Sequence, residues 1–270
     1  MSGLQDKSAL FASERQFHLG ITPDEIGKYV ILPGDPGRVA AIAAYLDGAV
    51  QVAQNREYNT YTGSLDGELV SVVSTGIGGP SAAIALEELA ACGVHTAIRV
   101  GTSGGMDLKV AGGDLVIATA SVRQEGTSRE YLPDGYPAAA DFTVVSALRD
   151  AADALSEEED GKRYHIGVIQ SKDSFYGETS PETMPVGGRL QAQWDAYLQC
   201  GCLASEMEAA ALFSVGLVRR VRVGAVLTAI WNVERPKAGL DDTTCTDSTR
   251  AIECAVGAMR RLIAADHRES

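Results

Sequence analysis

The sequence predicts a single α/β domain built on a mixed, largely parallel twisted sheet with helices on both faces. From Tyr29 onward, short β-branched runs alternate with amphipathic stretches of helical length. The runs are continuously apolar, as expected for parallel strands that are covered on both faces. No internal repeat and no Pro- or Ser-rich linker divides the 270 residues. We therefore expect a loose, polar leader over residues 1–16 and one domain over residues 17–270.

Each element follows from a local pattern. The apolar runs predict strands at 29–32, 68–75, 96–100, 114–120, 164–170 and 221–230, with a short strand around Leu203. The amphipathic stretches predict helices near 36–46, 80–92, 141–155, 206–219 and 248–265. Asp66-Gly67 separates two alternating runs between Glu57 and Ser74, which indicates an antiparallel hairpin. The acidic stretch 156–161 is typical of a solvated helix end and loop.

Composition excludes several classes of function. The chain has 36 acidic and 23 basic residues and a net charge of -13, which argues against non-specific binding to nucleic acid or anionic membranes. It leaves open an anionic substrate held by a few local arginines. No window approaches the ~20 apolar residues that a membrane-spanning helix needs. The five cysteines are an odd count and no secretion signal is present, so we expect free thiols and a cytoplasmic protein.

The segment Pro33-Gly34-Asp35-Pro36-Gly37-Arg38 directly follows the first predicted strand. Ligands of open α/β sheets bind beyond the carboxyl ends of the strands. Asp35 suits a helix N-cap, Pro36 suits the first helical position, and Gly34 allows close approach to a ligand. A cation such as Arg38 is unfavourable at a helix N-terminus unless an anion lies between them. An anion site and a plain turn with a surface arginine both remain open here.

The glycine turn at 75–81 resembles half of a dinucleotide fingerprint. That fingerprint requires an acidic residue at the end of the next strand, where this chain has Arg99 and no carboxylate. A turn beside a substrate phosphate or sugar is therefore favoured over a dinucleotide site.

The pattern Gly101-x-Ser103-x-Gly105 formally matches the nucleophile elbow of serine hydrolases. An elbow needs a helix immediately afterwards, whereas residues 106–113 are few and end in two glycines. A serine esterase therefore remains only a remote alternative. Arg99, near the end of a central strand, must be paired, and a bidentate oxyanion ligand would satisfy it.

Glu206 and Glu208 lie two residues apart where a helix is predicted to begin. Carboxylates there can simply complement the helix dipole. Alternatively, a carboxylate pair can grip the vicinal hydroxyls of a sugar, which require acceptors in fixed positions. The two interpretations stay open at this point.

Seven segments together carry a resemblance to a known family. They are FHLG at 17–20, PGDPGR at 33–38, REYNTYTG at 56–63, STGIGGPS at 74–81, RVGTSGG at 99–105, KDSFYG at 172–177 and SEMEAAALF at 205–213. In their order and spacing the chain resembles the nucleoside phosphorylase-I family, most closely its uridine phosphorylase branch. The resemblance implies a partly barrel-like sheet and a single catalytic domain over residues 17–270. It also implies cleavage of uridine by phosphate to uracil and ribose 1-phosphate, in nucleoside catabolism and pyrimidine salvage.

The same resemblance implies a set of site residues. Phosphate would be bound by Gly34, Arg38, Arg99 and Thr102, with Arg56 reaching in from a neighbouring subunit. Ribose would be bound by Glu206, Met207 and Glu208, with His18 contributed by the adjacent subunit. The base would contact Thr102, Phe175, Glu178 and Asn232, and the catalytic group would be Arg99, Thr102 and Glu208.

The resemblance further implies partners but no organic cofactor. Phosphate is the co-substrate, and the expected assembly is a homo-oligomer, a dimer or a hexamer built as a trimer of dimers. Glu57, Ile77 and Ser81 match the positions that hold a monovalent cation, K⁺, at the dimer interface of some uridine phosphorylases. Neither nucleic acid nor a membrane is an expected partner.

The base is the weakest part of the resemblance. At about the position of Glu178 the uridine branch has a Gln, usually followed shortly by an Arg. This chain has no arginine between Glu178 and Arg189. A glutamate accepts from a ring N–H but cannot donate to a carbonyl unless it is protonated. A modified pyrimidine or a purine therefore stays open, although Asn232 favours the uridine branch over purine phosphorylases, which typically have Asp there. Arg235 is a candidate for the missing donor.

Phosphorolysis suits these residues chemically. It needs a phosphate dianion held by cations, a ribose pinned while positive charge develops on it, and hydrogen bonds to the departing base. Such catalysis is mostly positioning and electrostatics, without a protein nucleophile. The alternatives are a purine nucleoside phosphorylase, a nucleosidase of the same fold that uses water, and a non-catalytic nucleoside-binding protein.

Overall fold

The computed structural model describes residues 15–158 and 163–269. Most of the predicted leader and half of the predicted acidic loop at 156–161 therefore lie outside the described residues. Within the described ranges, no helix combines the length and apolar character that crossing a bilayer requires.

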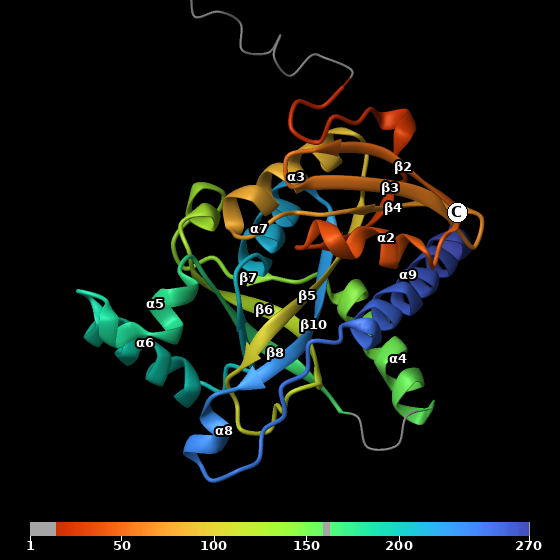
Figure 1. The fold of residues 1–270 in the computed structure, drawn as a ribbon. Coiled ribbons are helices and arrows are strands. Elements are labelled where there is room, and N and C mark those ends of the chain that lie inside the picture. Colours follow the sequence, from red (N-terminus) through yellow and green to blue (C-terminus); the bar gives the residue numbers. More distant parts are fainter. Residues whose placement is uncertain (1–14, 159–162, 270) are drawn as a thin grey trace, which may run out of the picture.

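The described strands form one mixed sheet that closes partly into a barrel (Figure 1). The order is β10-β6-β8-β9-β5-β1-β4-β3-β2, with β7 beside β6, and β10 also pairs with β5. This last pairing closes β5, β10, β6, β8 and β9 into a ring, from which β1, β4, β3 and β2 extend as an open sheet. The strands are β1 Tyr29–Pro33, β2 Asp47–Asn55, β3 Tyr58–Leu65, β4 Glu68–Val73, β5 Thr96–Gly105, β6 Leu115–Gln124, β7 Ala138–Ala139, β8 Tyr164–Lys172, β9 Ala204–Glu206 and β10 Arg222–Asn232.

Strand β5 stands where the ring and the open sheet meet. Its first half pairs with β1 in parallel, up to Val100 opposite Pro33. Its last two residues, Gly104 and Gly105, pair with β9 in the antiparallel direction. Between these two pairings β5 has no neighbour on that side, so the sheet splits beside residues 101–103. Such a split at the carboxyl end of parallel strands is where ligands bind in open α/β sheets.

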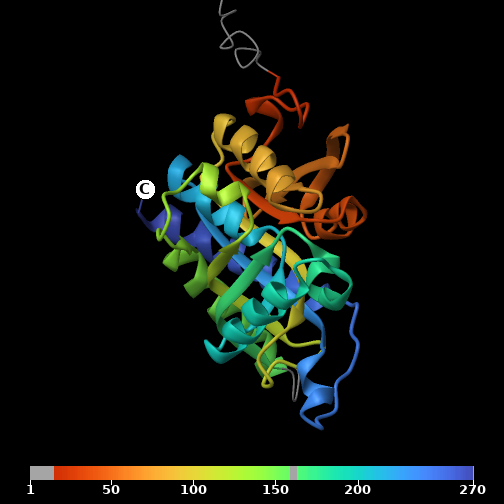
Figure 2. The ribbon, with the colours of Figure 1, turned by 90° about the vertical axis from the view of Figure 1, so that its left-hand side faces the viewer.

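Helices cover both faces of the sheet (Figures 1 and 2). Helix α3 packs against α7 on one face, and α4 packs against α9 on the other. Leu86 and Phe213 belong to the first apolar layer, and Leu148 and Met259 to the second. The helices are α2 Val39–Ala43, α3 Gly79–Ala91, α4 Phe142–Glu158, α5 Phe175–Thr179, α6 Gly187–Gln199, α7 Ala209–Arg219, α8 Glu234–Lys237 and α9 Thr249–Glu269.

The predicted hairpin is present as β3 and β4, but three features differ from the sequence prediction. The helix expected at 36–46 is a single 3-10 turn, Pro36–Arg38, followed by the short helix α2. The helix expected from residue 206 begins at Ala209, because Glu206 still belongs to β9. Strand β2 and helix α6 were not predicted. Most of β2 is exposed, so it carries no continuous apolar run. Helix α6 does carry apolar residues at helical spacing, Leu190, Trp194, Tyr197 and Leu198, although none of its residues is fully buried.

Candidate active site

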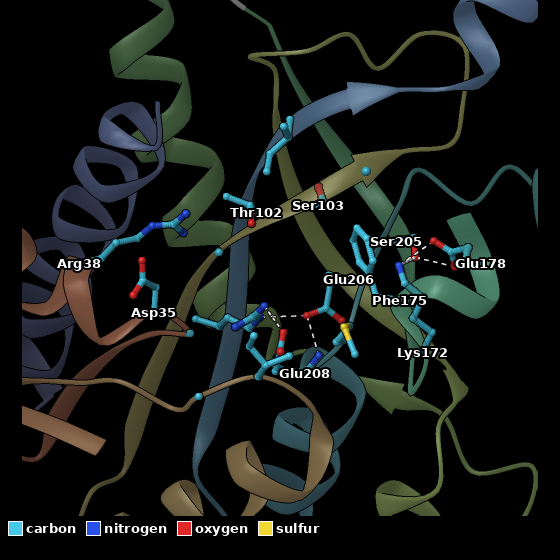
Figure 3. Close-up of a pocket in the computed structure, with 18 of the residues that line it drawn as sticks. Asp35, Arg38, Thr102, Ser103, Lys172, Phe175, Glu178, Ser205, Glu206 and Glu208 are labelled. Carbon is cyan, nitrogen blue, oxygen red and sulfur yellow. Dashed lines mark hydrogen bonds and ion pairs between the residues drawn. The ribbon is translucent and has the colours of Figure 1, made fainter. Parts of the chain in front are cut away.

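A cavity of about 580 Å³ opens at the split beside β5 (Figure 3). The residues around it come from the carboxyl ends of β1, β5, β8, β9 and β10, from the turns after β2 and β4, and from α5. The cavity contains most of the predicted site residues: Gly34, Arg38, Glu57, Ile77, Arg99, Thr102, Phe175, Glu178, Glu206, Met207 and Glu208. Four predicted residues do not line it: His18, Arg56, Ser81 and Asn232.

The turn after β1 forms one end of the cavity. Asp35 caps it as predicted, since its Oδ1 accepts from the Gly37 amide at 2.8 Å. Arg38 lines the cavity and is only partly exposed. Within the described residues its guanidinium has no ion-pair partner. A Cβ on Gly34 would lie 3.8 Å from Arg99 Nη1 and 3.4 Å from the Gly76 carbonyl, so glycine keeps the space beside that guanidinium open.

Arg99 is the central cation of the cavity and is only 3% exposed. Its Nε donates to Glu206 Oε2 at 3.0 Å, and its Nη2 donates to Glu208. Its Nη1 is buried and has no hydrogen-bond partner among the described residues. The prediction that this arginine is paired is therefore confirmed, with carboxylates as the partners. The two N–H groups of Nη1 therefore remain available to a ligand.

The two glutamates are held in different ways. Glu206 accepts from the backbone amides of Glu208 and Ala209 at 2.9 and 3.0 Å, which satisfies the start of α7. Glu208 instead accepts from the Gly78 amide at 2.6 Å and from Arg99. Glu206 thus serves partly as a helix cap, whereas Glu208 faces the cavity and links it to the glycine turn.

Burial and charge act against each other at this pair. Burial raises the pKa of Glu208, and the neighbouring Arg99 only partly opposes that rise. Burial alone would lower the pKa of Arg99, but Glu208 and Glu206 outweigh it and the net shift is upward. Arg99 therefore stays charged throughout the working pH range.

The other end of the cavity holds a cluster that sequence reasoning missed. Lys172, the last residue of β8, donates from Nζ to Glu178 Oε1 and to Ser205 Oγ, both at 2.6 Å. Ser205 Oγ in turn donates to Glu178 Oε2 at 2.9 Å. Figure 3 shows the three side chains pointing toward one another beside Phe175, at the opposite end from Arg38. Lys172 is the last residue of a parallel strand, as Pro33 is. A charged residue at that position was the signal from which Lys172 could have been predicted.

His18 and Arg56 lie apart from the cavity of their own chain. The His18 Nδ1 atom is 2.7 Å from Glu88 Oε1. Arg56 sits in the tight, exposed turn between β2 and β3, with a φ of 53°. Neither position tests the prediction that these residues act in a neighbouring subunit.

Of the predicted cation ligands, two are in contact. Ser81 Oγ donates to Glu57 Oε1 at 2.8 Å. The backbone amide of Glu57 itself and the Ser81 hydroxyl hold the pKa of Glu57 below its usual range. Ile77 is 79% exposed beside the cavity.

Asn232, a predicted base contact, does not line the cavity. Its side chain is fully buried away from the cavity, where Nδ2 donates to the Asp107 and Val110 carbonyls at 2.8 Å. Arg235 does not supply the missing donor either. Its Nε donates to the Asp241 carbonyl at 2.8 Å, and it does not line the cavity.

Ser103 does not have the setting of a nucleophile. It lies inside β5, which continues to Gly105, so no strand–turn–helix elbow forms around it. Its hydroxyl has no hydrogen-bond partner in the part of the chain described, and no histidine lines the cavity. The structure therefore contradicts the esterase alternative.

Comparison with known proteins gives a consistent result. The family described as the phosphorylase superfamily matches residues 28–264. A uridine phosphorylase from Treponema pallidum is 51% identical over 257 residues, 95% of this chain and 98% of the relative. A uridine phosphorylase from Escherichia coli is 37% identical over 252 residues, 92% of this chain and 98% of the relative. A guanosine phosphorylase from Halorubrum lacusprofundi is 39% identical over 219 residues, covering 81% and 84%. The chain therefore belongs to the phosphorylase superfamily.

Proposed function

We propose that this protein is a nucleoside phosphorylase that converts uridine and inorganic phosphate to uracil and ribose 1-phosphate. One observation carries the proposal: the buried Arg99 keeps an unused Nη1 donor beside Gly34, in a cavity that Arg38 also lines. In a chain of net charge -13, such a local pair of cations suits an anionic substrate. The names of the similar uridine phosphorylases support the same reaction.

The arrangement of residues suggests how the reaction proceeds. Arg38, Arg99 and Thr102, with the backbone at Gly34, hold hydrogen phosphate below the anomeric carbon. Glu208 and Met207 hold the ribose, while Phe175 contacts the base. A phosphate oxygen bonds to C1′ as the C1′–N bond breaks, and the electron pair leaves with the base. The proton of hydrogen phosphate ends on that base, so no organic cofactor and no protein nucleophile is required.

A base-release assay tests the proposal. Uridine, thymidine, guanosine, inosine and adenosine are each incubated with and without phosphate, and the free base is measured. We expect phosphate-dependent release of uracil. Undiminished cleavage without phosphate would identify a nucleosidase instead. Release of guanine without release of uracil would favour the second candidate, a guanosine phosphorylase, which the Halorubrum relative supports.

We further propose that residues 17–270 form one catalytic domain that works in the cytoplasm, in nucleoside catabolism and pyrimidine salvage. The five cysteines are all unpaired, which suits a reducing compartment.

We also propose a homo-oligomer, a hexamer built as a trimer of dimers, in which His18 and Arg56 complete the site of a neighbouring copy. Both residues lie outside their own cavity. Two large apolar side chains, Phe17 and Ile77, are 62% and 79% exposed. Such exposure in a single chain suits residues that are buried against a neighbouring copy.

Mixing two inactive variants tests this sharing. Arg99→Lys removes the donor inside the cavity, and the double variant His18→Ala/Arg56→Ala removes the partner groups. After joint refolding we expect about a quarter of wild-type activity, because half of randomly formed dimers are mixed and each carries one intact site. Activity that stays at the level of the separate variants would show that each site is built from one chain.

For the cation, we propose that Glu57, Ser81 and the Ile77 carbonyl supply oxygen ligands for K⁺. The donor set fits, since Glu57 is anionic and already within 2.8 Å of the Ser81 hydroxyl. Binding to the folded state alone raises stability. We therefore expect the thermal midpoint to be higher by a few degrees in potassium chloride than in tetramethylammonium chloride. Glu57→Gln would lose the difference, and an equal difference in that variant would refute the assignment.

A further inference from the structure

The base end of the cavity contains a donor and an acceptor held next to each other. Lys172 is 7% exposed and Ser205 2%. The ammonium has three N–H groups, of which two are used by Glu178 and Ser205. Each oxygen of Glu178 accepts one hydrogen bond here and has capacity for another. One donor and at least one acceptor therefore remain for a ligand.

The side chains that carry this free donor and this free acceptor line two cavities, of about 580 and 550 Å³, which share Lys172 and Glu178. Lys172, Glu178 and Ser205 all line the same cavity as Arg99. The Lys172 ammonium also lies 5.9 Å from the centre of the Phe175 ring, which fixes it near the aromatic wall. Three separate elements, β8, α5 and β9, supply the three side chains, so their relative positions are set by the fold.

We propose that Lys172 and Glu178 together read the edge of a base that carries a ring N–H next to an exocyclic carbonyl. Glu178 accepts from the ring N–H, and Lys172 donates to the neighbouring carbonyl oxygen. An amino base such as cytosine presents a bare ring nitrogen and an amino group at the same positions. Its bare ring nitrogen would face the Glu178 oxygen, another acceptor, and its amino group would face the Lys172 ammonium, another donor. Lys172 and Glu178 would therefore reject such a base. This inference rests on the proposed function.

The same ammonium assists departure of the base. When the glycosidic bond breaks, the electron pair moves onto the base and its negative charge spreads to the carbonyl oxygens. A cation already hydrogen-bonded to one of those oxygens stabilises the transition state more than the ground state. Lys172 thus supplies the donor that a glutamate at position 178 cannot.

Substrate analogues test the reading with the wild-type enzyme. We compare uridine, 3-methyluridine, which lacks the ring N–H, and cytidine, all at saturating phosphate. We expect kcat/KM to fall by about 10²-fold or more for each analogue, since each leaves a buried polar group unpaired. Equal rates with uridine and cytidine would overturn the inference and leave the phosphorylase function standing. No phosphate-dependent cleavage of uridine would instead refute the proposed function.

A double-mutant cycle separates base contact from mere support of Glu178. Lys172→Met is made in the wild type and in Glu178→Gln, with Lys109→Met as the matched control, a lysine that pairs with Asp107 and does not line the cavity. If Lys172 contacts the base, Lys172→Met lowers kcat with uridine about 10²-fold in both backgrounds. It does so less with 5-fluorouridine, whose base leaves more easily.

A loss that disappears in the Glu178→Gln background would show that Lys172 only holds the carboxylate, and would overturn the inference. Equal losses with uridine and 5-fluorouridine would overturn the leaving-group role. Circular dichroism checks that each variant folds. Should Lys172→Met fail to fold, the wild-type comparison of uridine, 3-methyluridine and cytidine decides alone.

Discussion

Replacing Arg99 by lysine should lower kcat/KM for phosphorolysis about 10²- to 10³-fold while the protein still folds. Alanine would leave Glu206 and Glu208 as unpaired buried carboxylates, a change that costs about 3–5 kcal/mol of stability. Lysine keeps a positive charge between them but has no second arm to offer phosphate. We expect the loss to divide between a higher KM for phosphate and a lower kcat, measured by phosphate saturation at fixed uridine.

Arg222→Lys is the matched control. Arg222 is also a charged residue of a central strand, but its guanidinium pairs with Asp266 in α9, away from the cavity. That variant should keep wild-type kinetics. An Arg99→Lys enzyme with the phosphate KM and kcat of the wild type would remove Arg99 from the phosphate site.

Replacing Glu208 by glutamine should lower kcat/KM for uridine about 10²-fold. The amide still accepts from the Gly78 N–H, so the fold around the glycine turn is kept. The substitution removes the negative charge that opposes the positive charge of the transition state. It also replaces one of the carboxylate oxygens that accept from the ribose hydroxyls by an NH₂ group, which cannot accept. If the 2′-hydroxyl is one of the groups held, the penalty should be smaller with 2′-deoxyuridine than with uridine.

The pH profile gives a second measurement of the same residue. Because burial raises the pKa of Glu208, its carboxylate is protonated, and kcat/KM falls, as the pH drops through a range above that of an ordinary glutamate. Glu208→Gln should lack this acidic limb. Glu125→Gln, at another buried carboxylate whose Oε2 accepts from the Ser128 amide at 2.9 Å, is the control. If Glu208→Gln lowers kcat/KM equally for uridine and 2′-deoxyuridine, the assignment of Glu208 to the ribose diol is contradicted.

Most of the fold could be predicted because burial leaves a pattern in the sequence. The runs at β1, β5, β6 and β10 are apolar since most of their residues are buried. In β4 and β8 only the carboxyl-terminal part is buried, but the apolar run was enough to predict the strand. Strand β2 is mainly exposed and carries no such run. Helix α6 has apolar residues at helical spacing between Leu190 and Leu198, but it was not predicted. Closure of the sheet through β10 and β5 is a long-range pairing, which no local periodicity specifies. It was expected only from the family resemblance.

Which residues line the cavity could be predicted where the backbone position decides it, but not where the direction of the side chain does. Gly34, Arg99 and Glu208 follow strand or turn positions, and all three line the cavity. Asn232 also ends a strand, but its amide turns inward to backbone carbonyls. Lys172 was missed because its partner Ser205 lies 33 residues away in the chain. Only the folded structure brings these two side chains together.

The split beside β5 has a consequence for how this enzyme can diverge. The proposed anion-binding end rests on β1 and β5, and the proposed base-reading end rests on β8 and α5. The short strand β9 contacts both ends through Glu206 and Ser205. Substitutions in α5 can therefore change which base is accepted without disturbing the arginines. A uridine phosphorylase and a guanosine phosphorylase among the relatives are what such a modular layout permits. New nucleoside specificities should accordingly be selectable from libraries confined to α5 and the end of β8.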